Sequence, residues 1–152
     1  METRMRRIGA DFHRFFMKTF TGMLEKKHTT EKILGAFYAV YNELGYGFLE
    51  RVYQNALYLE LQEMGLGVVA QPQIGVVYKG RQVGTYFADL LVENEIILEL
   101  KACECMLDEH RLQLQNYLKA TDIELGFLLN FGRKPEFARL IFSNNKKRQR
   151  SR

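Results

Sequence analysis

Two carboxylates and a lysine within residues 88–102 form the pattern in this sequence that most clearly predicts chemistry. Alternate side chains of an extended strand lie on one face, so Glu99 and Lys101 share a face of a strand expected over residues 96–101. If residues 93–95 form a hairpin loop, Asp89 lies directly opposite Glu99, with Cβ atoms about 4.5–5.5 Å apart. Two carboxylates at that distance repel each other unless a proton or a cation lies between them, and such oxygen ligands suit Mg²⁺ or Mn²⁺.

Lys101 supplies a positive charge beside this pair. Its ammonium could hold an attacking water or stabilise the charge that develops on a phosphate, and a metal could lower the pKa of that water. The competing interpretation is an ordinary exposed ion pair between Glu99 and Lys101. The strand IILELK is otherwise apolar, however, and a strand covered on both faces should not carry Glu and Lys without partners. The pattern therefore favours a functional site over a structural network.

Two predicted helices offer further polar groups. Glu50 and Tyr53 are one helical step apart, and a carboxylate near a helix start also suits the helix dipole. His110, Gln113 and Tyr117 follow i, i+3, i+7 spacing and therefore line one face of a later helix. Each of these residues alone is more often a structural hydrogen-bonding group, so it is their occurrence together with the Asp and the Glu-x-Lys that favours a joint site.

Other chemistries fit the sequence less well. Cys103, Cys105 and His110 could bind zinc, but Cys-x-Cys is not the usual Cys-x₂-Cys spacing, and a fourth Cys and a second nearby His are missing. A Ser/His/Asp hydrolase is disfavoured because the only serines, Ser143 and Ser151, lie after the last predicted strand and in the basic tail. The sequence contains no glycine-rich loop of the kinds that bind nucleotide phosphates.

The elements expected to position these residues alternate between helical and strand patterns. The predicted order is ααβββαββ, with helices at about 30–44, 48–64 and 104–120 and strands at about 68–78, 82–92, 96–101, 125–130 and 138–142. Thr30 is the expected cap of the first helix, and Lys79-Gly80 is the expected turn between the first two strands. This order predicts a mixed α/β domain at residues 29–144 whose sheet is extended through a helical crossover.

The charge is divided along the chain. Residues 1–28 carry a net charge of +4, residues 145–152 carry +5, and residues 29–144 carry −5. We therefore expect a basic N-terminal extension at 1–28, which could form a short amphipathic helix unless Met23 is the true start, and a basic C-terminal tail at 145–152. Flexible basic ends attract nucleic acid, so Lys146, Lys147, Arg148 and Arg150 are candidate nucleic-acid-binding residues, although tails that only improve solubility fit equally well.

The composition is that of an ordinary globular protein, with 47% hydrophobic and 26% charged residues over 152 positions. It excludes a wholly disordered chain, a collagen and a coiled coil. No apolar run approaches the roughly 18 residues of a membrane span, and no secretory signal is visible. The two cysteines are too close in sequence to join distant segments, which favours a reducing, cytoplasmic environment.

Residues 47–53, GFLERVY, resemble the G-x-x-E-x-x-Y signature of the GxxExxY proteins, a branch of the PD-(D/E)xK nuclease superfamily. The resemblance extends from about Thr30 to Phe142 and is specific because further blocks follow in order: ADL (88–90), ELK (99–101), HRLQLQNYLKAT (110–121) and GFLLNFG (126–132). It implies a restriction-endonuclease-like core, in which helices flank a mixed β-sheet.

The resemblance also implies roles for particular residues. Asp89 and Glu99 match the metal ligands, Lys101 matches the catalytic lysine, and Glu50 matches the acidic residue that the exonuclease-like branch contributes from its first core helix. Two further residues, Gln113 and Tyr117, match the Q-x-x-x-Y motif near the metal and the phosphate, with His110 and Tyr53 as secondary candidates. Ala88 stands where the superfamily name has Pro, but that position binds nothing.

Two classes of function follow. The first is a nuclease that uses Mg²⁺ or Mn²⁺ to hydrolyse phosphodiester bonds of nucleic acid, with DNA expected before RNA as its partner. The second is a catalytically silent nuclease fold that binds nucleic acid or a protein. The presence of Asp89, Glu99 and Lys101 together favours the first class.

Overall fold

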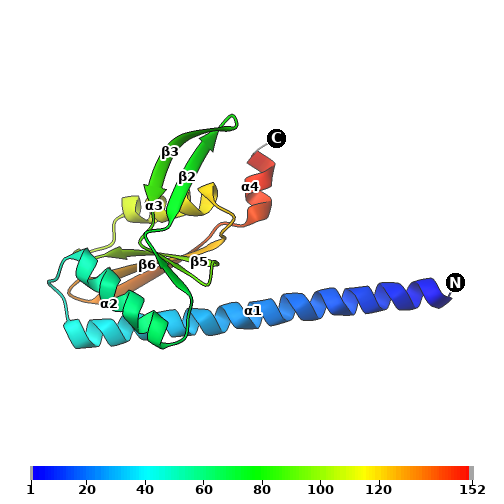
Figure 1. Cartoon of the computed structure of the whole chain (residues 1–152), viewed down its shortest axis with the longest axis horizontal. Helices are drawn as coiled ribbons and strands as arrows, with labels where there is room; N and C mark the ends of the chain where they lie inside the picture. Colours follow the sequence, from blue (N-terminus) through cyan, green and yellow to red (C-terminus); the bar gives the residue numbers. More distant parts are fainter. Residues whose placement is uncertain (1, 151–152) are drawn as a thin grey trace. The chain divides into compact units, whose positions relative to one another are not determined.

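The computed structural model describes the backbone of residues 2–150 and the side chains of residues 10–147 (Figure 1). Its helices are α1 (Glu2–Leu44), α2 (Glu50–Glu63), α3 (Asp108–Ala120) and α4 (Asn144–Arg150). Its strands are β1 (Val68–Ala70), β2 (Gln73–Tyr78), β3 (Arg81–Phe87), β4 (Leu90–Val92), β5 (Ile96–Lys101), β6 (Leu125–Phe131) and β7 (Pro135–Ile141). None of the helices within residues 2–150 is long and apolar enough to cross a membrane.

A five-stranded mixed sheet lies at the centre of the fold, with strand order β1-β4-β5-β6-β7. Among the strand pairs of residues 2–150, only β5–β6 is parallel, and it is connected by α3 because parallel neighbours need a crossover. The central strand β5 is buried from Ile96 to Leu100, as its apolar sequence predicts for a strand covered on both faces. The predicted class, an α/β fold with a mixed sheet flanked by helices, is therefore confirmed.

Different helices cover the two faces of the sheet, with α2 and α3 on opposite sides (Figure 1). On the α3 side, Leu114 and Leu118 join a buried cluster with Ile97 and Leu128. On the other side, Phe131 of β6 packs against aromatic rings: its centroid lies 4.8 Å from that of Phe37 in α1 and 4.4 Å from that of Tyr53 in α2. The site-bearing strand β5 therefore lies between two apolar layers.

The two long strands predicted at 68–78 and 82–92 are each divided in two, so that prediction is wrong in detail. Gln71 adopts φ 52°, and Pro72 has no N–H to donate to a strand neighbour. The first part of one predicted strand, β1, pairs with the last part of the other, β4, in the main sheet. The remaining parts, β2 and β3, form a separate two-stranded sheet, and the predicted Lys79-Gly80 turn connects these two strands. Where the two segments cross, the Gln71 N–H donates to the Asp89 carbonyl.

The helical boundaries differ from the predictions at both ends of the chain. The first helix does not begin at Thr30 but runs through it from Glu2, because no proline interrupts the residues before it and the helix continues through Gly9 and Gly22. The tail expected to be flexible forms α4, which begins at Asn144, whose N–H donates to Glu124 Oε1 at 2.7 Å. The chain divides into two compact units, Met1–Gly35 and Ala36–Arg152, and the second contains the sheet and all the candidate residues from Glu50 onward.

Candidate functional site

The β4–β5 hairpin places Asp89 and Glu99 beside each other. Its register pairs Leu90 with Leu98 around a turn at residues 93–95, in which Glu93 and Asn94 have positive φ. One step beyond the last pair, the Asp89 N–H donates to Glu99 Oε1 at 3.1 Å, and the Leu100 N–H donates to Asp89 Oδ2 at 2.7 Å. Backbone hydrogen bonds therefore fix both carboxylates in the arrangement that the hairpin geometry predicts.

The surroundings of this pair favour a bound proton or cation. Glu99 is only 3% exposed, and burial, followed by the charge of Asp89, raises its pKa to about 8. Burial also raises the pKa of Asp89, although the Leu100 N–H and the charge of Lys101 oppose this shift. Near neutral pH the metal-free pair therefore retains a proton, in the position where a divalent cation would satisfy both carboxylates.

Lys101 ends β5, two residues after Glu99 and on the same face of the strand. It is half-buried, and its positive charge opposes the rise in the pKa of both carboxyl groups. In the parallel β5–β6 pair, Lys101 is in register with Asn130. The site thus combines two carboxylates with one ammonium at the end of the central strand.

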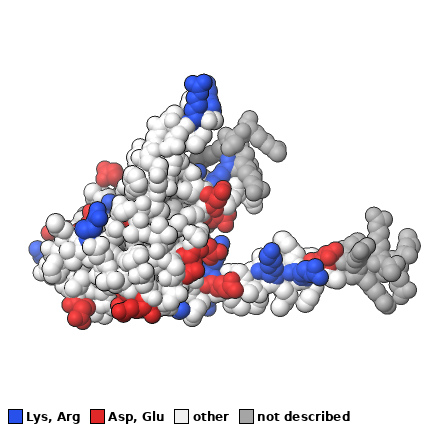
Figure 2. Space-filling model, in the orientation of Figure 1, with Lys and Arg blue, Asp and Glu red and all other residues white. Residues whose placement is uncertain are grey.

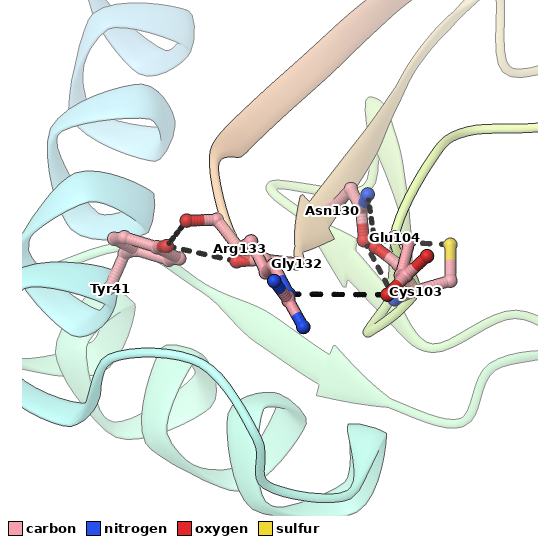
Figure 3. A network of polar contacts seen from close by, with 6 residues as sticks. All are labelled: Tyr41, Cys103, Glu104, Asn130, Gly132 and Arg133. Carbon is pink, nitrogen blue, oxygen red and sulfur yellow. Dashed lines mark hydrogen bonds and ion pairs between the residues drawn. The ribbon is translucent and has the colours of Figure 1, made fainter.

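Asn130, which the sequence analysis did not identify, holds the loop that follows Lys101. The side chain is fully buried; it accepts the Cys103 N–H at 3.1 Å and donates Nδ2 to the Cys103 carbonyl at 2.9 Å (Figure 3). A side chain at Gly132 would collide with the same carbonyl, so only glycine fits there. The signal that could have identified Asn130 is one amide in an otherwise apolar strand, LGFLLNF.

Tyr41 of α1 forms hydrogen bonds with the turn between β6 and β7. Its hydroxyl lies 2.6 Å from the Arg133 carbonyl oxygen and 2.9 Å from that of Gly132 (Figure 3). Arg133 and Glu104 also face each other at 3.9 Å, but both side chains are largely exposed, so this ion pair contributes little. The turn and the loop after Lys101 are therefore held mainly by hydrogen bonds to backbone atoms.

Glu50 and Tyr53 occupy different environments. Glu50 is the exposed first residue of α2, and its negative charge contributes to the raised pKa of Glu99. Tyr53 is fully buried; its hydroxyl donates to the Gly45 carbonyl at 2.6 Å and lies 3.3 Å from the Phe48 nitrogen. Tyr53 thus closes the loop that leads into α2 and so positions Glu50.

The three candidates on α3 do not act as one group. Gln113 Nε2 donates to the Tyr117 hydroxyl at 2.9 Å, and burial raises the pKa of Tyr117, to which the charges of Glu99 and Asp89 also contribute. These two residues therefore lie near the carboxylates. His110 instead accepts the Leu107 N–H on Nδ1 at 3.2 Å and so caps the start of α3.

The zinc alternative is not supported. Among the side chains of residues 10–147, no group of three or more His, Cys, Asp and Glu is arranged to hold a metal ion, and this applies to the acidic residues around Asp89 as well as to the two cysteines and His110. The Cys103 thiol donates to the Cys105 carbonyl, and burial raises its pKa, which disfavours the thiolate that zinc requires. The Asp89–Glu99 pair does fit Mg²⁺, which commonly binds one or two carboxylates and retains several waters for a phosphate to replace.

The basic tail is partly used within the protein. The Lys147 ammonium donates to the carbonyl oxygens of Thr121 at 2.7 Å and Ile123 at 2.8 Å, next to the end of α3. Lys146 is exposed. The side chains of Arg148 and Arg150, also predicted to bind nucleic acid, lie outside the described residues.

Comparisons with known proteins identify a family. The family model of the PD-(D/E)XK nuclease superfamily matches residues 27–140. A comparison with curated protein sequences gives no match. The crystal structure of SSO0001 is similar at 19% sequence identity and a TM-score of 0.49, over 62% of this chain and 50% of SSO0001, so the likeness extends over half of that protein.

Proposed function

This chain belongs to the PD-(D/E)XK nuclease superfamily, and we propose that it hydrolyses phosphodiester bonds of nucleic acid with a divalent cation, Mg²⁺ or Mn²⁺, at Asp89 and Glu99. The observation that carries the proposal is the buried pair itself. Two carboxyl groups with raised pKa values face each other at the end of the central strand, with Lys101 on the same face. A purely structural role leaves the cost of burying two acids together unexplained.

Each residue has a distinct role in this proposal. Asp89 and Glu99 hold the cation, which when bound supplies a water of lowered pKa and neutralises phosphate charge. The Lys101 ammonium orients the attacking water and balances charge on the phosphate. The Tyr117 hydroxyl, oriented by Gln113, contacts the phosphate from α3. Glu50 adds negative charge on the α2 side, which strengthens cation binding.

We further propose that the chain belongs to the GxxExxY branch of the superfamily, because the glutamate and the tyrosine of its signature are structurally linked. Tyr53, the tyrosine of GFLERVY, forms hydrogen bonds with the loop on the N-terminal side of α2, and Glu50, its glutamate, is the first residue of that helix. This link between Tyr53 and Glu50 gives a physical reason for the spacing of the signature.

The test is a cleavage assay with the full chain. Labelled single- and double-stranded DNA and RNA are incubated with Mg²⁺, Mn²⁺ or EDTA, and thermal unfolding is measured with and without each metal. We expect cleavage only with metal, and a metal-dependent rise in the unfolding temperature, because a ligand that binds only the folded state stabilises it. If no substrate is cleaved and no metal raises the unfolding temperature, the silent binding module is the better account.

A further inference from the structure

A groove of about 730 Å³ lies between the β2–β3 hairpin and α3. Apolar side chains of the hairpin line one wall, and α3 provides the other, which carries the charged residues Glu109 and Lys119 beside Leu112, Gln113, Asn116, Tyr117 and Ala120. Its volume is in the range of small-ligand sites, which combine apolar walls with a few polar groups that orient the ligand. The groove is thus large enough for a nucleobase and offers it both kinds of contact.

A bulge in β3 interrupts the regular pairing of the β2–β3 hairpin. The register changes between Val76 and Val77, so that Val76 faces Gly84 and Val77 faces Gln82. The pairing passes over Val83, so the extra residue lies in β3 and the alternation of its side chains changes there. Val76 and Val77 of β2 both line the groove, together with Tyr86 of β3. The hairpin wall of the groove therefore consists of two valines and one aromatic ring.

Tyr117 and Gln113 connect the groove with the surroundings of the proposed catalytic site. Tyr117 lines the groove and also belongs to the buried cluster that contains Ala88 and Ile97, neighbours of Asp89 and Glu99. Gln113, hydrogen-bonded to Tyr117, lines the groove as well. A strand whose phosphate lies at the carboxylates can therefore place an adjacent base in the groove.

Tyr86 is the aromatic surface available for that base. Its side chain is 53% exposed, and its ring lies 6.1 Å from that of Tyr117 at an angle of 45°, so the two rings do not stack on each other. The hairpin tip carries Lys79 and Arg81, which form the basic patch at the end of the projecting arm in Figure 2. Aromatic side chains that stack bases, together with basic groups that attract phosphates, are typical of single-strand binding.

We propose that this groove binds an unpaired base of the substrate strand, stacked on Tyr86 and hydrogen-bonded by the amide of Asn116. The substrate class is then single-stranded or locally unpaired nucleic acid, because both faces of a paired base in a duplex are covered by its neighbours. This inference rests on the proposed function for the position of the phosphate.

The test measures binding separately from cleavage. Fluorescence anisotropy gives the Kd of a labelled single-stranded DNA oligonucleotide and of its blunt duplex, both in EDTA so that no metal-dependent cleavage occurs. The variants are Tyr86→Ala, Tyr86→Phe and the control Phe87→Ala. Phe87 is 54% exposed and neighbours Tyr86, but it points to the opposite face of β3.

We expect Tyr86→Ala to weaken single-strand binding about 10-fold, since one stacked base contributes that much or more. Tyr86→Phe keeps a ring and should bind as wild type, Phe87→Ala should change Kd little, and the duplex should bind more weakly than the single strand. Equal effects of Tyr86→Ala and Phe87→Ala, equal affinity for duplex and single strand, or no binding by the wild type would overturn the inference. Absence of cleavage in Mg²⁺ with this binding pattern intact would instead count against the proposed function alone.

Discussion

At Asp89 and Glu99, the backbone orients both carboxylates before any cation arrives. Each accepts one backbone N–H, from Leu100 and from Asp89 respectively, so neither side chain must reorganise to bind. The cost of this preorganisation is electrostatic, because burial and mutual repulsion raise the pKa of Glu99 to about 8. A divalent cation removes that cost, which explains why such a pair is stable only as a protonated or metal-bound site.

The raised pKa predicts how the stability of the metal-free protein depends on pH. The folded state binds a proton at Glu99 up to about pH 8, whereas the unfolded chain releases it near the ordinary value of 4.5. The contribution of the Glu99 proton to the free energy of unfolding is therefore complete below pH 4.5 and is lost as the pH rises through 8. Between these values the free energy of unfolding falls with a slope approaching about 1.4 kcal/mol per pH unit. Denaturant unfolding in EDTA from pH 5.5 to 8.5 should show this decline for wild type relative to Glu99→Gln. A difference between the two proteins that stays constant with pH would contradict it.

Among the elements, the hairpin that carries the site could be predicted from the sequence, whereas the loop that supports it could not. The turn at residues 93–95 and the period of two in β5 determine which residues face each other, so Asp89 and Glu99 followed from local rules. Asn130 and Tyr41 hydrogen-bond to backbone atoms 27 and 91 residues away, and backbone atoms leave no pattern in a sequence. The sequence did not predict that β2 and β3 form a separate sheet, because the alternation of apolar and polar residues in these strands continues that of β1 and β4.

At the level of the elements, Asn130→Ala should loosen the end of β5. Asn130 is buried, whereas Cys103 is partly exposed, so water can partly replace the two lost hydrogen bonds and we expect a loss of roughly 1–3 kcal/mol in the free energy of unfolding. The matched control is Asn55→Ala, an exposed position on α2, which should change stability by less than about 0.5 kcal/mol. Denaturant unfolding of the two variants checks this, and equal losses would show that Asn130 does not fasten the loop.

Over the whole molecule, the charge is separated between an acidic domain and basic ends. We propose residues 29–144 as the nuclease domain and residues 1–28 and 145–152 as basic extensions that attract the nucleic-acid backbone. The structure modifies this picture at Lys147, whose ammonium is hydrogen-bonded to carbonyls near the end of α3 and so helps to anchor α4. The other basic residues of the tail are better candidates for phosphate contacts.

Replacing Lys146, Arg148 and Arg150 together by Gln should therefore reduce the salt dependence of nucleic-acid binding and leave the fold intact. Each lost phosphate contact lowers the slope of log K against log salt concentration by about 0.7 for a single strand and about 0.9 for a duplex. Anisotropy titrations at several salt concentrations measure the slope, and thermal unfolding checks the fold. An unchanged slope would show that α4 does not contact the phosphates.

The most direct measurement of the central claim is the cleavage rate of Glu99→Gln beside that of Glu95→Gln, with Mg²⁺ or Mn²⁺ present. Both variants replace a glutamate by its isosteric amide on the same hairpin, but Glu99 is buried next to Asp89, whereas Glu95 is exposed in the turn. The site assignment predicts that Glu99→Gln loses several orders of magnitude in rate because it removes a metal-binding charge, and that Glu95→Gln cleaves as wild type. Equal cleavage by Glu99→Gln and wild type would contradict the assignment of Asp89 and Glu99 as the catalytic metal site.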